Sequence, residues 1–171
     1  MKKRFLFLLT LCFLFGSGGL AEAPVLTDAD FVLIYDRVSY TLRTDPSALI
    51  AAVARHDGTE MQLEEADSCL FDGKDKEYYG DELILGTYPV GKGGTDVLES
   101  IVIAGGPWET ARGIRVGSSR QDVLVAYGAA VQDYDQWLYA LGEPYRGPTL
   151  IFQFDLETDR VICIFLLACS A

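Results

Sequence analysis

The sequence predicts an α+β fold in which two tandem helix–β–β–β units share one antiparallel sheet, with the helices packed on one face. The first observation is the element order, because a short helix followed by three strands occurs twice, with helix starts at Asp45 and Ser119. The second is a set of local echoes, such as "SIVI" against "CIFL", which indicate a weak internal repeat. Units this small cannot each bury enough apolar surface alone, so we expect them to share a sheet.

The N-terminal segment is typical of a secretory signal peptide. Basic residues at positions 2–4 precede an apolar run over 5–15 and then several small residues. The run is shorter than the roughly 20 residues of a membrane-spanning helix. Cleavage after Ala21 or after Ala23 satisfies the small-residue pattern. The predicted organisation is a signal peptide over 1–21, a first α/β unit over 22–109 and a second α/β unit over 110–171.

The chain is strongly acidic, with 14 Lys and Arg against 25 Asp and Glu. Loss of residues 1–21, which hold three basic residues and no acidic one, moves the net charge from −11 to −14. Nucleic acids and anionic membranes require a basic footprint, so the charge argues against both as partners. We expect a secreted or cell-envelope protein that does not insert into a membrane after signal cleavage.

In the first unit, the β-branched and aromatic residues of Phe31–Leu42 predict a strand or hairpin. A helix is expected to begin after Asp45 and to end at Gly58, since Asp caps helices and Gly stops them. An acidic connector follows. Strands are then predicted in "SCLFDG" and "EYYGDELILGTYP", around a turn at Asp72–Gly73, and in "DVLESIVIAGG".

In the second unit, Ser119 is a helix N-cap with Asp122 as its capping-box partner, and Gly128 is the expected end of the helix. "DYDQWLYALG" predicts a strand with Trp137 and Tyr139 on one side. "TLIFQFDL" predicts a second strand, with Leu150, Phe152, Phe154 and Leu156 on one side and Ile151 and Gln153 on the other. "VICIFLLA" is apolar at nearly every position, which favours a central or covered strand.

Three cysteines remain after the signal peptide: Cys69, Cys163 and Cys169. Six residues of continuous strand would hold Cys163 and Cys169 roughly 20 Å apart. A disulfide needs Cα atoms about 4.4–6.8 Å apart, so these two should not pair. Either all three are buried thiols, or Cys69 forms a bridge with one of the others.

The stretch "GIRVGSSRQDVLVAYG", the aromatic strands after it and "LIFQFDLETDRVICI" resemble the helix–β–β repeat of the small BamE/OmlA-like outer-membrane assembly lipoproteins. The same repeat occurs in tandem in β-lactamase inhibitor protein. With "SCLFDGKDKEYY" and "TYP", most of residues 30–168 is also similar to uncharacterised exported proteins of Gram-positive gut bacteria. The resemblance implies an exported α/β repeat protein that binds proteins. It implies no catalytic residue, because the matching positions are turns, caps and core.

The residues themselves predict neither a catalytic centre, nor a cofactor, nor a metal site. "GTYPVGKG" imitates a phosphate-binding loop, but Gly93 replaces the required hydroxyl and a strand follows instead of a helix. His56 is the single histidine, and its place near a helix C-terminus favours a capping or surface role. "DGKDKE" lacks the pattern of a calcium-binding loop.

The aromatic segment Tyr134–Pro148 is the best candidate for recognition, because Tyr and Trp supply rigid contact area at interfaces. The alternative is that Trp137 and Tyr139 fill the core. The sequence thus predicts a non-enzymatic exported module that binds an unknown protein or peptide. A secreted carboxylate-dependent cell-wall or glycan hydrolase is the competing hypothesis. The candidate partner-binding residues are Tyr134, Trp137, Tyr139, Tyr145 and Gln153.

Overall fold

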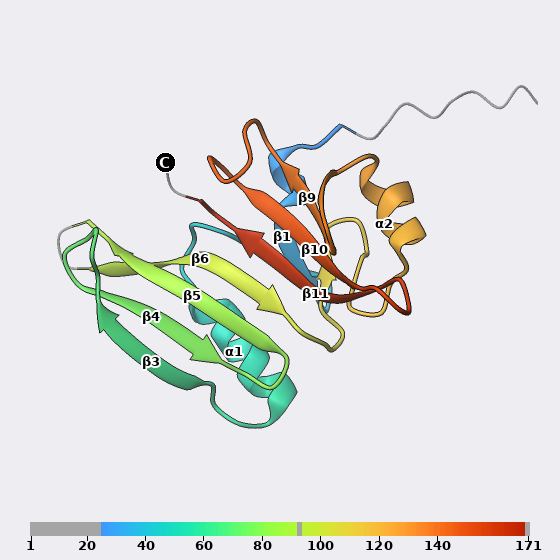
Figure 1. Cartoon of the computed structure of the whole chain (residues 1–171). Coiled ribbons are helices and arrows are strands. Elements are labelled where there is room, and N and C mark those ends of the chain that lie inside the picture. The colour runs from blue at the N-terminus through green and yellow to red at the C-terminus, as the bar shows by residue number, and fades with distance from the viewer. Residues whose placement is uncertain (1–24, 92–93, 170–171) are drawn as a thin grey trace, which may run out of the picture.

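A computed structural model of the chain describes residues 25–91 and 94–169 (Figure 1). The predicted signal peptide and both of its cleavage sites lie outside the described residues. The elements in chain order are the 3-10 helix η1 (Asp28–Asp30), β1 (Val32–Tyr35), β2 (Val38–Thr41), α1 (Ser47–Asp57), β3 (Gln62–Asp67), β4 (Lys74–Tyr79), β5 (Leu83–Val90), β6 (Thr95–Ile103), β7 (Glu109–Thr110), α2 (Arg120–Tyr127), β8 (Val131–Asp133), β9 (Gln136–Ala140), β10 (Thr149–Asp155) and β11 (Arg160–Leu167).

An eight-stranded sheet in the order β3-β4-β5-β6-β11-β10-β9-β8 dominates the fold. All of its neighbouring strands are antiparallel. The pairing of β6 with β11 joins the two halves of the chain, and it sets Ile103 opposite Ile164 and Ile101 opposite Leu166. A separate small sheet has the order β2-β1-β7.

The predicted arrangement of two helix–β–β–β units is wrong. Each α-helix is followed by four strands of one large sheet, and β1, β2 and β7 form the small sheet apart from it. In the first half, β3 lies in the stretch expected to be an acidic connector, and the predicted strand "SCLFDG" is a loop. The predicted strand "EYYGDELILGTYP" contains the end of β4 as well as most of β5. In the second half, the predicted strand "DYDQWLYALG" is a hairpin that contributes both β8 and β9. Strands therefore far outnumber helices. The predicted boundary between the two units, at residues 109 and 110, falls inside β7.

The hydrophobic core lies between the large sheet and the elements that cover one of its faces. Leu49 and Val53 of α1, Val123 and Tyr127 of α2 and Leu33 of β1 belong to one buried cluster with the large sheet. Figure 1 shows α1 and β1 behind this sheet, whose other face is turned to the viewer. In the described part of the chain, no helix is long and apolar enough to cross a membrane.

The predicted helix ends are confirmed, except that the N-cap of α1 is Pro46, one residue after the predicted Asp45. The Asp45 carboxylate accepts the backbone N–H of Ser47 at 2.8 Å, at the start of α1. Gly58 ends α1 with a φ of 73°, in the left-handed region that favours glycine. In α2, Ser119 and Asp122 form the predicted reciprocal capping box, and Gly128 follows the last residue of the helix.

The cysteines of the described residues are free thiols. Cys163 and Cys169 do not pair, as the strand geometry predicted. Cys69 is exposed in the loop between β3 and β4, so it is neither a buried thiol nor half of a disulfide in this structure.

Candidate partner-binding face

Both α-helices and the small sheet pack on one face of the eight-stranded sheet, and we call the opposite face the open face. Side chains alternate between faces along each strand, so residues between the core positions point to the open face. The strand register aligns one such apolar residue from each of seven neighbouring strands. We call this line the apolar row, and it consists of Tyr79, Ile84, Val102, Phe165, Ile151, Leu138 and Val131.

Exposure varies along the apolar row. Val131 at the β8 edge is 59% exposed, whereas Ile151 and Leu138 are 6% and 7% exposed. Adjacent strands lie about 4.8 Å apart, so the row spans roughly 30 Å. In the described part of the chain, the core cluster includes no member of the row. The remaining members, Tyr79, Ile84, Val102 and Phe165, are half-buried.

Two other register rows lie beside the apolar row, and they are largely polar. One crosses the sheet through Glu64, Glu77, Gly86, Ser100, Leu167, Thr149 and Ala140. The other consists of Cys163, Gln153, Gln136 and Asp133. Every charged side chain in these two rows is a carboxylate. An apolar centre with a polar rim is the usual anatomy of a protein–protein interface.

Carboxylates gather at the β3–β4 end of the open face, and we call Glu64, Asp75, Glu77 and Glu99 the acidic patch. Glu64 and Glu77 are direct cross-strand partners. Asp75 lies two residues before Glu77 and therefore on the same face of β4. Burial, and the charge of Asp75, raise the pKa of Glu99. Within residues 25–91 and 94–169, the Asp75 Oδ1 atom is buried and has no hydrogen-bond partner.

The hydroxyl of Tyr79 donates a hydrogen bond to Glu77. This bond raises the pKa of Tyr79 to about 12. It leaves the negative charge of Glu77 in place, because the hydroxyl is neutral. Among the described residues, no group of three or more His, Cys, Asp or Glu side chains is placed so as to hold a metal ion.

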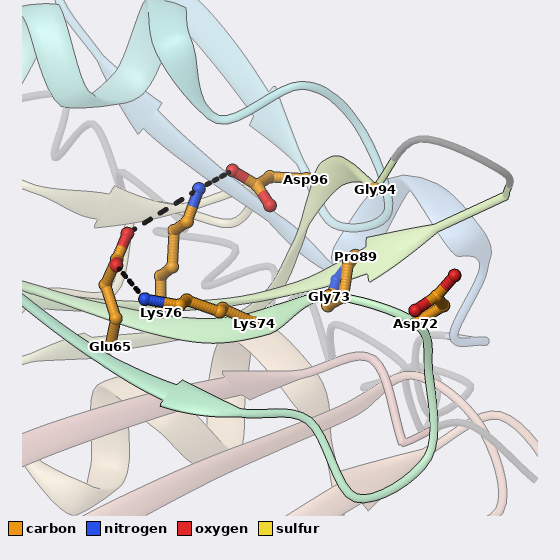
Figure 2. Close-up of a pocket in the computed structure, with 8 residues that line it drawn as sticks. All are labelled: Glu65, Asp72, Gly73, Lys74, Lys76, Pro89, Gly94 and Asp96. Carbon is orange, nitrogen blue, oxygen red and sulfur yellow. Dashed lines mark hydrogen bonds and ion pairs between the residues drawn. The ribbon is translucent and has the colours of Figure 1, made fainter.

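On the other face of the hairpin formed by β3 and β4, lysine side chains are paired with carboxylates, as Figure 2 shows. Lys74 Nζ lies 2.9 Å from Glu65 Oε2, and Lys76 Nζ lies 2.7 Å from Asp96 Oδ2 and 4.0 Å from Glu65 Oε1. The hydrogen bonds to Glu65 and Asp96 raise the pKa values of Lys74 and Lys76, respectively. These side chains line an open cavity of about 400 Å³. Its two ammonium groups are already bound to carboxylates of the protein.

The structure separates the residues predicted to bind a partner. Tyr134 and Tyr145 are 84% and 57% exposed, in the turns that flank β9. Gln153 lies on the open face, where its side chain donates to Asp135 Oδ2 at 3.0 Å. Trp137 and Tyr139 are 6% and 3% exposed and belong to the core cluster. They fill the core, which was the alternative to a binding role.

Trp137 and Tyr139 are buried because odd-numbered residues of β9 face the helices. The Trp137 ring packs against Phe154 with ring centres 5.2 Å apart, and the hydroxyl of Tyr139 donates to the carbonyl oxygen of Gly128 at 2.9 Å. The open-face residues that sequence reasoning missed are Leu138 of the same strand and apolar residues of six other strands. The signal was present in "VICIFLLA", because a strand that is apolar on both faces also places Phe165 on the face opposite the core.

His56 has two polar contacts. Its Nδ1 atom lies 3.4 Å from the hydroxyl of Tyr35, and its Nε2 atom lies 3.4 Å from Glu82 Oε2. Its ring also meets the Trp108 ring edge-on, with centres 5.5 Å apart. These distances are long for hydrogen bonds. They join the end of α1 to β1 and to the turn before β5, which agrees with a structural role.

No protein-family model, no curated protein sequence and no solved structure matches this chain. The resemblance to BamE/OmlA-like and β-lactamase-inhibitor-like repeats therefore stays a prediction from the sequence.

Proposed function

We propose that this protein is an exported, non-enzymatic module that binds a protein or peptide partner, outside the cell or at the cell envelope, through the open face. The observation that carries the proposal is the apolar row, which crosses seven strands on the face opposite the core. The five members that are exposed or half-buried favour association, because removing apolar surface from water is worth about 25 cal/mol per Å². Its polar flanking rows give the face a rim that can stay hydrated.

The test is capture of a partner by the mature protein and by matched variants. Purified protein is used to capture proteins from envelope and culture-supernatant fractions of a native-like host, and each captured protein is then purified and its affinity measured. Phe165→Thr removes an aromatic ring from the centre of the row and puts in its place a β-branched residue, which suits a strand. Leu156→Thr is the control, since Leu156 is apolar and 54% exposed but follows β10 in a turn.

We expect Phe165→Thr to abolish binding of the purified partner and Leu156→Thr to keep it, with both variants folded by circular dichroism. A Tyr134→Ser/Tyr145→Ser variant examines the hairpins of the second half as the competing surface. Loss of binding in that variant alone would move the site from the open face to those hairpins. A partner that binds all variants equally would contradict both surfaces.

A secreted carboxylate-dependent cell-wall or glycan hydrolase remains the second candidate. The specific observation in its favour is the proximity of Asp75 and Glu99, because a raised carboxyl pKa is a property of general acids in glycoside hydrolysis. A panel of peptidoglycan and glycan substrates tests it directly. Hydrolysis by the wild type that disappears in Glu99→Gln would replace the binding proposal with this one.

A further inference from the structure

We infer that the partner of the open face is a cationic polypeptide, whose Lys or Arg side chains contact the acidic patch while its apolar side chains cover the apolar row. This inference rests on the proposed function and adds the chemistry of the partner. It follows from a contrast between the two faces of the β3–β4 hairpin, from the cost of leaving the patch unpaired, and from the length of the apolar row.

The contrast concerns where the hairpin places its lysines. Lys74 and Lys76 both lie on the face away from the open face, where they neutralise Glu65 and Asp96 (Figure 2). On the open face, the same two strands present Glu64, Asp75 and Glu77. The hairpin thus compensates its charge on one side and accumulates negative charge on the other.

The accumulated charge opposes folding. Like charges directly opposite each other on neighbouring strands destabilise a sheet, and Glu64 and Glu77 are such a pair. Asp75 adds a second repulsion with Glu99, which is partly withdrawn from water. A local conflict without a compensating contact is expected at functional sites. Cationic side chains from a partner would remove both repulsions.

The apolar row identifies the cation as part of a polypeptide. A line of apolar side chains roughly 30 Å long matches an extended segment or a protein surface, not a small organic cation. A second copy of this chain is disfavoured as the occupant. Face-to-face contact would bring two acidic patches together, and each copy carries a net charge of −11, so the two copies would repel each other. Acidic proteins are disfavoured for the same reason.

The experiment uses a displayed library of random twelve-residue peptides, selected on the mature protein. The affinity of each enriched peptide is then measured on four proteins: the wild type, Phe165→Thr, the patch variant Glu77→Gln/Glu99→Gln, and the control Glu143→Gln/Glu157→Gln. The control removes two charges from exposed turns outside the large sheet, so it separates local contact from general attraction.

We expect the enriched peptides to combine Lys or Arg with apolar residues and to lose binding in Phe165→Thr. The patch variant should bind them about tenfold more weakly, which is about 1.4 kcal/mol, while the control should stay within about twofold. Binding should also weaken as salt rises. Peptides that need Phe165 but are neutral or acidic, or that ignore the patch variant, would overturn this inference and leave the proposed function standing. Failure to enrich any peptide that depends on Phe165 would overturn the proposed function as well.

Discussion

Arg112 holds Asp30 by two hydrogen bonds, from Nε to Oδ1 at 2.6 Å and from Nη2 to Oδ2 at 2.7 Å. The same guanidinium donates to the carbonyl oxygens of Ala126 and Val25, at 2.8 Å and 2.9 Å. It also lies over the Tyr127 ring, 5.0 Å from its centre. The Arg112 side chain thereby links the start of the described chain to the end of α2. We therefore expect the packing of these segments on the covered face of the sheet to depend on Arg112.

Replacing Arg112 with Ala should destabilise the fold strongly. Asp30 is 6% exposed, and loss of Arg112 would leave this buried carboxylate without a cationic partner, held only by hydrogen bonds from Thr27. We expect the free energy of unfolding to fall by about 3 kcal/mol in a denaturant titration. Arg115→Ala is the matched control, because its 3.6 Å contact with Glu109 is solvent-exposed and should be worth less than about 1 kcal/mol. Equal losses in the two variants would contradict the special role of Arg112.

The Asp30–Arg112 pair should also make stability depend on pH. The hydrogen bonds from Arg112 hold the pKa of Asp30 below its ordinary value of 3.8. A carboxyl whose pKa is lower in the folded state stabilises the fold above its unfolded pKa, and this contribution is lost as the pH falls through the folded-state pKa. Unfolding free energies measured from pH 6 to pH 2 should therefore decrease below about pH 4. In Arg112→Ala this decrease should be smaller, and an unchanged pH profile would contradict the assignment.

The acidic patch should reduce stability in the absence of a partner. Glu64→Gln removes the cross-strand repulsion with Glu77, so we expect thermal unfolding to shift upward, with a gain of about 0.2–1 kcal/mol. Glu65→Gln, one residue away on the same strand, instead loses the contacts with Lys74 and Lys76. It should leave stability unchanged or slightly lower. A lower melting temperature for Glu64→Gln would show that the patch is satisfied within the protein itself.

Local chemistry in the sequence predicted the helices well. Asp45, Gly58, Ser119 and Gly128 each lie at a helix end, a position that their residue types favour, and such preferences are decided within a few residues. "VICIFLLA" was predicted to be a central or covered strand because it is apolar on both faces, and β11 lies in the middle of the sheet between β6 and β10. These features need no knowledge of the rest of the fold.

The sheet size and the candidate site needed information that is absent locally. β3 is exposed along its whole length and carries three acidic residues, so it has none of the apolar alternation by which strands are recognised. Its strand structure comes from pairing with β4. In the same way, the apolar row exists only through the register of seven strands. Trp137 was a reasonable candidate from its residue type, but the side of β9 that faces the core was set by that register.

Cys163 provides a built-in probe of the open face. It is in register with Gln153, and burial raises the pKa of its thiol, so it should react slowly with a maleimide reagent near neutral pH. Cys69 is exposed and lies in the loop at the far end of β3, so it should be modified first. Mass spectrometry of the alkylated protein gives the rate at each residue. Adding a peptide that binds the open face should slow the reaction of Cys163 and leave that of Cys69 unchanged, because only Cys163 lies beside the apolar row. Protection of Cys69 alone would place the partner on the β3–β4 loop instead, and equal rates with and without the peptide would remove the open face as its site.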